Sequence, residues 1–209
     1  MYLPSHFEDT DSEAIAGLIA ACPLAAIICV HEDEIIANHI PLMMAGGSEL
    51  VGHIASANTL HEQIADGARV LAIFRAEDAY ISPNWYPTKQ DTHRHVPTWN
   101  YQVVHIRGRI TFSHARKDKV AVVGKMTKIQ EQKNSGDRAW KMSDAPRDYM
   151  DQMLDNIVAF RIDIENIAAK SKLSQNCEAA DFDGVSRAMQ RTGRKTLSDG
   201  MTRLRGDNA

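Results

Sequence analysis

A stretch near the N-terminus holds three strand-like runs separated by turn signals, and this spacing constrains the fold more than any other feature. Leu24–Val30 is continuously apolar, which predicts a buried strand. Glu32-Asp33 is expected to turn the chain into a strand at Glu34–Met44, and Gly46-Gly47 to turn it into a third at Leu50–Ala55. Strands joined this closely pair antiparallel, because a parallel pair needs a long crossover.

The rest of the chain continues the same pattern. Further strands are expected at Val70–Arg75, Ala79–Ser82, Trp99–Phe112 and Val158–Ile167. Helices are expected from Thr10 or Asp11 to Pro23, over Asn58–Asp66 and Ala115–Gln130, and from Ser143 to about Leu154. Six or seven strands with few helices predict a mainly β protein with peripheral helices (α+β), built as a closed or nearly closed antiparallel barrel.

Composition and motifs exclude several classes of protein. The chain has no GxGxxG, P-loop or GxSxG motif, which argues against Rossmann, NTPase and hydrolase folds. Its longest apolar stretch, Cys22–Val30, is too short to span a bilayer, and Met1–Thr10 lacks the features of a secretory signal. We therefore expect a cytoplasmic protein with no membrane partner. The three cysteines form no CxxC pair, so buried or free thiols are expected.

One local charge asymmetry stands out against a net charge of −3. Residues 184–209 carry six basic side chains and two acidic ones, a difference of +4. This segment is either a solvated helix surface or a contact for nucleic-acid phosphates, so DNA stays open as a partner. We expect a barrel domain at residues 1–176 and a helical, basic extension at residues 177–209.

The densest polar and aromatic cluster begins at Thr98. Trp99 and Tyr101 share one face of the expected strand and offer flat surfaces, while Thr98 and Asn100 offer hydrogen bonds. This combination suits a planar heteroaromatic ligand, although a core strand with one buried tryptophan would look the same. His93, His95 and His105 raise a metal alternative, but no helical His-x-x-x-His pair supports it and no metal site is predicted.

Two other stretches are candidates for binding. Ser56 and Asn58 precede the helix expected at Asn58–Asp66, so its N-terminus could hold a phosphate, with Arg75 or Lys172 adding charge. An ordinary capped helix is the alternative. The polar segment 170–176 is either an exposed turn or a ligand clamp. No nucleophile is assembled in the sequence, so any chemistry is expected to come from a cofactor.

Six blocks of the sequence together resemble the PaiB family, described as FMN-binding negative transcriptional regulators. They come in the family's order over nearly the whole chain: residues 1–7, 38–42, 52–58, 80–86, 96–101 and 172–176. The resemblance implies an antiparallel split β-barrel of the FMN-binding type, akin to pyridoxamine-phosphate oxidase. It also implies a homodimer with FMN in the groove between the two barrels.

The resemblance assigns the cofactor contacts by motif position. It implies FMN binding by His39, His53, Ser56, Asn58, Ser82, Thr98, Trp99, Asn100, Tyr101, Lys172, Ser174 and Gln175. We expect the family to have a basic residue where this chain has Ser56, and a proline where it has Thr59. This departure predicts weaker neutralisation of the phosphate at that loop.

The resemblance leaves three functions open. The first is a negative transcriptional regulator that binds FMN, as the family description implies. The second is an FMN-dependent oxidoreductase acting on a small molecule, so whether the chain is an enzyme is undecided. The third is haem binding, because related split barrels bind haem and the chain is rich in histidine.

Overall fold

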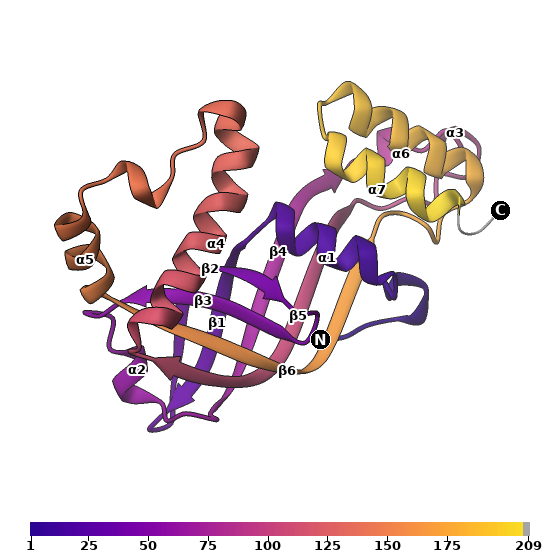
Figure 1. The fold of residues 1–209 in the computed structure, drawn as a ribbon. Helices are drawn as coiled ribbons and strands as arrows, with labels where there is room; N and C mark the ends of the chain where they lie inside the picture. The colour runs from indigo at the N-terminus through magenta and orange to yellow at the C-terminus, as the bar shows by residue number, and fades with distance from the viewer. Residues whose placement is uncertain (207–209) are drawn as a thin grey trace. The chain divides into compact units, whose positions relative to one another are not determined.

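Six strands form the sheet of this protein, which is described here from a computed structural model covering residues 1–206 (Figure 1). Their bounds are β1 Leu24–His31, β2 Glu34–Ala45, β3 Glu49–Ala55, β4 Arg69–Ile81, β5 Thr98–Ser113 and β6 Ile157–Lys172. Hydrogen bonds join them in the closed order β1-β2-β3-β6-β5-β4. The predicted antiparallel barrel with peripheral helices is confirmed.

The β1–β2 hairpin follows the sequence pattern closely. Leu24 lies opposite Pro41 and Val30 opposite Ile35, so the apolar run of β1 pairs along its whole length. Glu32 and Asp33 both have positive φ, as a tight two-residue hairpin turn of the right twist requires. The sequence therefore sets this register locally.

Residues 1–206 form seven helices besides the six strands. They are α1 Ser12–Ala21, α2 Leu60–Gln63, α3 Lys89–Thr92, α4 Arg116–Ser135, α5 Arg147–Asp155, α6 Ala179–Arg191 and α7 Lys195–Gly206, with single 3₁₀ turns at Ser5–Phe7, Pro83–Trp85, Gly136–Arg138 and Met142–Asp144. Asp11 caps α1 as expected, because its Oδ1 accepts from the amides of Glu13 and Ala14. None of the helices in residues 1–206 is long and apolar enough to cross a bilayer.

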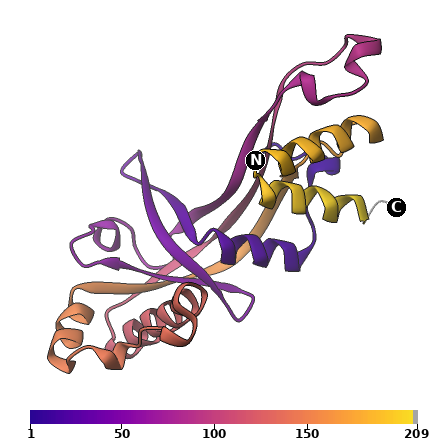
Figure 2. The same ribbon diagram turned by 90° about the horizontal axis from the view of Figure 1, so that it is seen from above.

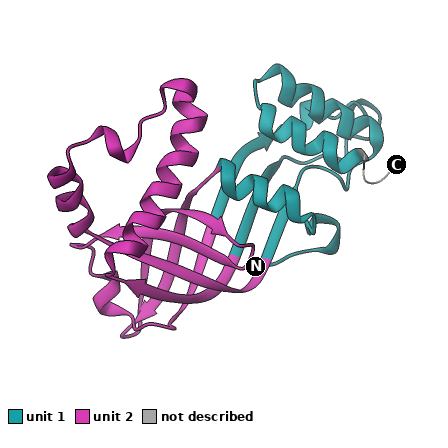
Figure 3. Ribbon diagram, in the orientation of Figure 1, with its two compact units in different colours: residues 1–21, 74–105, 168–209 teal, residues 22–73, 106–167 magenta. Residues whose placement is uncertain are grey.

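The chain divides into two compact units, each described by itself (Figure 3). Unit 1 comprises residues 1–21, 74–105 and 168–209, and unit 2 comprises residues 22–73 and 106–167. Strands β4, β5 and β6 each contribute residues to both units. In unit 2, α4 runs beside β3 (Figure 1).

Unit 1 has its own core, in which the C-terminal helices take part. Helices α6 and α7 lie side by side in both views (Figures 1 and 2). They bury Val185, Met189 and Leu197 against Ile81 and Leu173. The expected helical extension is thus present, and it shares a core with the end of β4. The domain boundary at residue 176 stays a prediction, and residues 207–209 lie outside the described part.

Two predicted elements were wrong. Val70–Arg75 and Ala79–Ser82 are not separate strands but one strand, β4, because ion pairs accommodate the charges between them: Arg75 pairs with Asp78 and Arg194 with Glu77. The helix expected at Asn58–Asp66 is only a single turn, α2, because the backbone becomes extended at Ile64.

Gly108 permits a close approach between β5 and β6. A Cβ at this position would lie 2.3 Å from the carbonyl oxygen of Asp163 and 2.7 Å from Ile162 Cγ2. Backbone cannot yield as a flexible side chain can, so even one methyl group would force the two strands apart.

We therefore expect Gly108→Ala to lower the free energy of unfolding by about 1–3 kcal/mol in urea denaturation. Gly124→Ala is the matched control, since its Cβ would make only an ordinary 3.5 Å contact in the middle of α4. It should hold stability or raise it by about 0.5–1 kcal/mol. Equal effects of the two substitutions would contradict this account.

Candidate functional site

A cavity of about 400 Å³ in unit 1 gathers four of the predicted cofactor residues, Thr98, Asn100, Lys172 and Ser174. Its volume lies in the range typical of small-molecule sites. The remaining lining residues are Phe7, Tyr86, Arg94, His95, Val96, Asn176 and Cys177. The beginning of β5, the end of β6 and the loop between β4 and β5 therefore form one site, which we call the unit 1 pocket.

Asn100 is the most buried polar residue of this pocket, with no exposed surface. Ser174 Oγ donates a hydrogen bond to Asn100 Oδ1 at 3.0 Å. Asn100 Nδ2 is buried and has no hydrogen-bond partner in residues 1–206. An amide donor left in this state costs about 1–3 kcal/mol, so a missing acceptor is indicated.

Lys172 brings a partly desolvated cation to the same pocket. Its Nζ donates to Thr98 Oγ1 and, at 2.9 Å, to the carbonyl oxygen of Trp99. Burial lowers the pKa of Lys172, and the nearby Lys170 ammonium lowers it further. In the described part of the chain no carboxylate pairs with either lysine, so their positive charges have no counterion there.

Two other polar groups of the pocket are neutral at physiological pH. Burial raises the pKa of the Tyr86 phenol to about 12 and that of the Cys177 thiol above its ordinary value. Neither group offers Lys172 a negative charge. Cys177 is therefore a poor nucleophile, as expected for a thiol in apolar surroundings.

His95 is held at the pocket by a carboxylate that the sequence gave no reason to pair with it. His95 Nε2 lies 3.0 Å from Asp181 Oδ2, and its ring stacks on Tyr86 at 5.0 Å. Asp181 also accepts hydrogen bonds from the amide and hydroxyl of Thr88, at 3.1 and 2.8 Å. Helix α6 thus fixes the long loop that lines the pocket.

The other predicted residues of unit 1 lie outside this cavity. Trp99 is half-exposed and meets Tyr80 edge to face at 5.9 Å, so it forms an exposed aromatic surface. The Tyr101 ring lies 5.5 Å from Lys170 Nζ. Ser82 Oγ caps the turn at Pro83–Trp85, and the Gln175 amide accepts from Leu173 N and donates to the Ser171 carbonyl.

Four predicted cofactor residues belong to unit 2. His39 is exposed on β2, opposite Ala26. His53 on β3 has a buried Nδ1 without a hydrogen-bond partner in residues 1–206, and burial lowers its pKa. Ser56 is exposed in the loop after β3, where its carbonyl oxygen bonds His61 Nε2 at 3.1 Å.

The expected phosphate site at a helix N-terminus is not formed by this loop. Asn58 Nδ2 donates to Asn38 Oδ1 at 2.9 Å, and Asn58 Oδ1 accepts from Leu60 N at 3.0 Å. Asn58 therefore fixes the loop to β2. Helix α2 has only four residues and begins after Thr59, so it is too short for the anion site proposed from its N-terminus.

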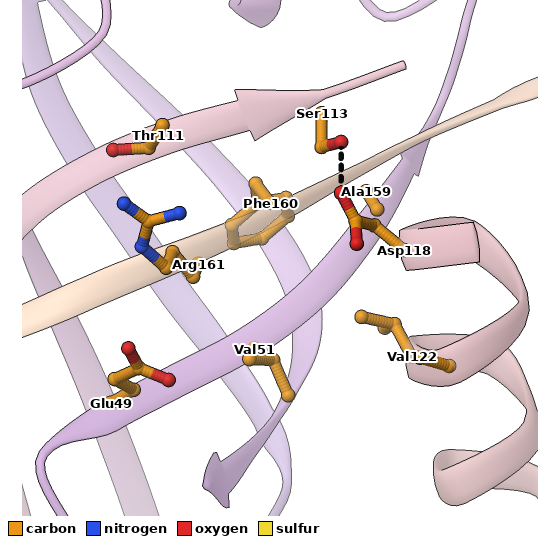
Figure 4. A pocket seen from close by; sticks show the side chains of 10 residues that line it. Glu49, Val51, Thr111, Ser113, Asp118, Val122, Ala159, Phe160 and Arg161 are labelled. Carbon is orange, nitrogen blue, oxygen red and sulfur yellow. Dashed lines mark hydrogen bonds between the residues drawn. The ribbon is translucent and has the colours of Figure 1, made fainter. Parts of the chain in front are cut away.

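A second cavity, of about 190 Å³, lies in unit 2 between α4 and the sheet (Figure 4). None of the predicted cofactor residues lines it. Three of its polar side chains already have partners: Ser113 donates to Asp118, and Arg161 pairs with Asp163. It is also smaller than typical ligand sites. We therefore take the unit 1 pocket as the candidate site.

Across residues 1–206, no group of three or more His, Cys, Asp or Glu side chains is placed to hold a metal ion. Of the three histidines considered for metal binding, His95 bonds Asp181 and Thr88, and His93 is exposed with positive φ.

Comparison with known proteins assigns the family. Residues 1–166 match the family model described as "Putative FMN-binding domain". The chain belongs to this family. It is 31% identical over 195 residues to the Bacillus subtilis protein "Protease synthase and sporulation protein PAI 2", covering 91% of this chain and 89% of that protein. It is thus an FMN-binding split-barrel protein of the PaiB type, as predicted.

Solved structures support the fold of this PaiB-type protein. The FAD and haem binding protein of Mycobacterium smegmatis superposes with a TM-score of 0.61 at 18% identity, covering 85% of this chain and 79% of that one. The flavocytochrome Anf3 of Azotobacter vinelandii superposes with a TM-score of 0.59 at 12% identity, covering 85% and 75%.

Asp181→Asn tests how the loop is held over the pocket. Burial alone would raise the pKa of Asp181, but hydrogen bonds from Thr88 and His95 outweigh it and hold the pKa below 3.8. A carboxylate of this kind stabilises the fold above its unfolded pKa, and the effect is lost as pH falls through the folded pKa. We expect the variant to lose about 1–3 kcal/mol at pH 7, with the difference from wild type narrowing below pH 3.8.

Urea denaturation across pH measures this difference. Asp148→Asn, at an exposed position of α5, serves as the control and should leave stability within about 0.5 kcal/mol. A loss in Asp181→Asn that is the same at every pH would show that the carboxylate's charge contributes nothing.

Proposed function

We propose that this PaiB-type protein binds FMN through those assigned residues whose polar groups other contacts leave available, foremost Asn100 and His53. The observation that carries the proposal is a pair of buried nitrogen atoms, His53 Nδ1 and Asn100 Nδ2. Neither has a hydrogen-bond partner in residues 1–206, and both belong to predicted cofactor residues. Buried polar groups in native proteins nearly always have partners, so two such exceptions in one predicted set support a missing ligand.

The chemistry of the remaining residues suits the cofactor. FMN supplies hydride or electron transfer when bound. Asn100 offers hydrogen-bond donors to a polar group of the cofactor, and Lys172 offers a positive charge in the same pocket. The half-exposed Trp99 ring, which meets Tyr80 edge to face, offers a flat apolar surface on which a ring can stack. We propose that the chain's own groups orient the ring, and that any oxidoreductase activity depends on it.

His53→Leu and Asn100→Asp test the proposal, because each removes an unpartnered nitrogen while the shape changes little. Each variant should weaken FMN binding about tenfold or more in fluorescence titration. The cofactor-free His53→Leu protein should be as stable as wild type or more stable, because a buried unpaired nitrogen is lost.

Asn134→Asp, at an exposed position of α4, is the matched control and should leave FMN affinity unchanged. If wild type bound FMN and both site variants bound it equally well, the residue assignment would be wrong. If wild type bound no FMN, the proposal itself would fail.

We also propose that the protein is a homodimer formed through the outer face of the β1–β2 hairpin. Leu24, Val30 and Ile35 are 59%, 64% and 77% exposed there. Because directly opposed residues point to the same side, these three and His39 share one face. Val30 also lines a hollow of about 750 Å³ in unit 2. Large exposed apolar side chains gathered on one face can mark an association site, and we propose a second copy as the partner because most soluble oligomers are symmetric homo-oligomers.

Ile35→Lys should therefore shift the protein from a dimer to a monomer of about 23 kDa in sedimentation velocity, since it would bury an unpaired charge in the interface. Ile129→Lys, a half-exposed position on α4, should leave the dimer intact. A wild-type protein that sediments as a monomer at micromolar concentration would contradict the proposed dimer.

The negative-regulator role is a separate proposal, which rests on the family description. Of the six basic side chains of the C-terminal segment, Arg194, Arg203 and Arg205 form ion pairs with carboxylates of unit 1. Arg187, Arg191 and Lys195 are exposed and are the residues we propose for any phosphate contact with DNA. A cytoplasmic location is also proposed, and the three free cysteines suit a reducing compartment.

A further inference from the structure

We propose that Lys172 and Asn100 form an anion subsite in the unit 1 pocket, which receives the carboxylate or phosphate of a small organic molecule with a flat apolar body. The inference concerns the charge of the ligand's polar group. It holds for FMN's own phosphate or for a separate substrate, and it does not depend on FMN occupying this pocket.

The pocket is surrounded by more positive than negative charge. The residues that line the pocket include Lys172 and Arg94 but no aspartate or glutamate. Of the acidic side chains near the lining, Asp181 is already engaged by His95 and Thr88, and the buried Asp9 by Ser171 and Arg203. Lys170, only 7% exposed, adds a second cation on β6. Desolvated cations without a counterion favour an anionic ligand, because the ligand repays part of the cost of burial.

Lys172 and Asn100 offer hydrogen-bond donors to a ligand in the pocket. An ammonium group has three donors, and two of those on Lys172 point to Thr98 Oγ1 and the Trp99 carbonyl oxygen. These two bonds fix the position of Nζ and leave one donor. Asn100 Nδ2 contributes donors that have no acceptor in residues 1–206, and Ser174 Oγ, bonded to Oδ1, holds the amide in that orientation. The pocket therefore presents an excess of donors over acceptors, which a carboxylate or phosphate oxygen would satisfy.

The walls of the pocket offer apolar and aromatic surface. Phe7, Tyr86 and Val96 supply aromatic and apolar surface around the charged end. Tyr86 is further fixed by its stack on His95. Tyr86 and Cys177 are neutral at physiological pH, so they do not compete with a ligand for Lys172. A ligand with an anionic end and a flat body matches these two kinds of surface.

The experiment uses paired probes that differ only in the anionic group. FMN and riboflavin test whether the anion is the cofactor's phosphate, and benzoate and benzamide test whether it is a separate carboxylate. Dissociation constants are measured by calorimetry for the full chain, with Lys172→Met, Asn100→Asp and Lys172→Arg as site variants. Lys125→Met, at an exposed position of α4, is the control.

We expect one anionic probe to bind about tenfold or more tightly than its neutral partner, and Lys172→Met to abolish that preference. Asn100→Asp should also abolish the preference for the anionic probe, because it replaces a donor with a carboxylate. Lys172→Arg should retain most of this preference, and Lys125→Met should retain all of it. If Lys172→Met and Asn100→Asp remove the difference in affinity between FMN and riboflavin, the subsite is assigned to the cofactor's phosphate. If the same variants remove the difference in affinity between benzoate and benzamide, the subsite is assigned to a separate organic anion.

Asn100→Asp keeps the size of the side chain and an acceptor for Ser174, so the inference stays testable if Lys172→Met fails to fold. No preference for either anion in wild type, or a preference that survives both Lys172→Met and Asn100→Asp, would overturn the inference. If wild type binds riboflavin as tightly as FMN but binds benzoate more tightly than benzamide, the result supports the subsite. It does not contradict the proposal that the protein binds FMN.

Discussion

The central constraint on the unit 1 pocket is a pair of polar groups that residues 1–206 compensate only in part: the buried amide of Asn100 lacks an acceptor for its nitrogen, and the ammonium of Lys172 lacks a carboxylate partner. Asn100 Nδ2 has no acceptor in the described residues, and Lys172 has no carboxylate partner there. Each is costly, and folded proteins retain such costs where the surrounding packing outweighs them. Here the packing comes from the core that β4, the 172–176 turn and the C-terminal helices share.

The architecture explains why these groups stay in place without a ligand. Strand β5 carries Asn100 and β6 leads to Lys172, so both are fixed by neighbouring strands. Ser174 adopts a left-handed conformation that turns its hydroxyl toward Asn100. On the opposite wall, Asp181 of α6 holds His95 and Thr88. The C-terminal helices, which follow the region matched by the family model, are thus part of the site.

The sequence predicted what depends on local pattern. Alternation and turn residues located the strands, and the Glu32-Asp33 turn and the Asp11 cap follow from chemistry within a few residues. The errors have a common cause, because they depend on partners far away in the chain. β4 continues through Glu77 because Arg194 pairs with it, and Asn58, predicted to contact a phosphate, donates its Nδ2 to Asn38 on β2. The Asp181–His95 pair joins residues 86 positions apart, and no local signal announces it.

The site residues show the same division. Motif resemblance named Thr98, Asn100, Lys172 and Ser174, and the structure brings these four together. The resemblance could not show that Gln175 and Ser82 use their polar groups in hydrogen bonds within turns. Nor could it show that the Asn100 amide would keep an unused donor. Those facts depend on which acceptors the fold places within about 3 Å of each donor.

The most direct measurement is a nuclear magnetic resonance titration that follows the side-chain amide of Asn100 as FMN is added. The account predicts that this resonance shifts strongly and that its protons become protected from exchange at saturation, as an amide does on gaining an acceptor. An Asn100 amide that is unchanged at saturating FMN, while other resonances shift, would contradict the claim that the cofactor satisfies this nitrogen.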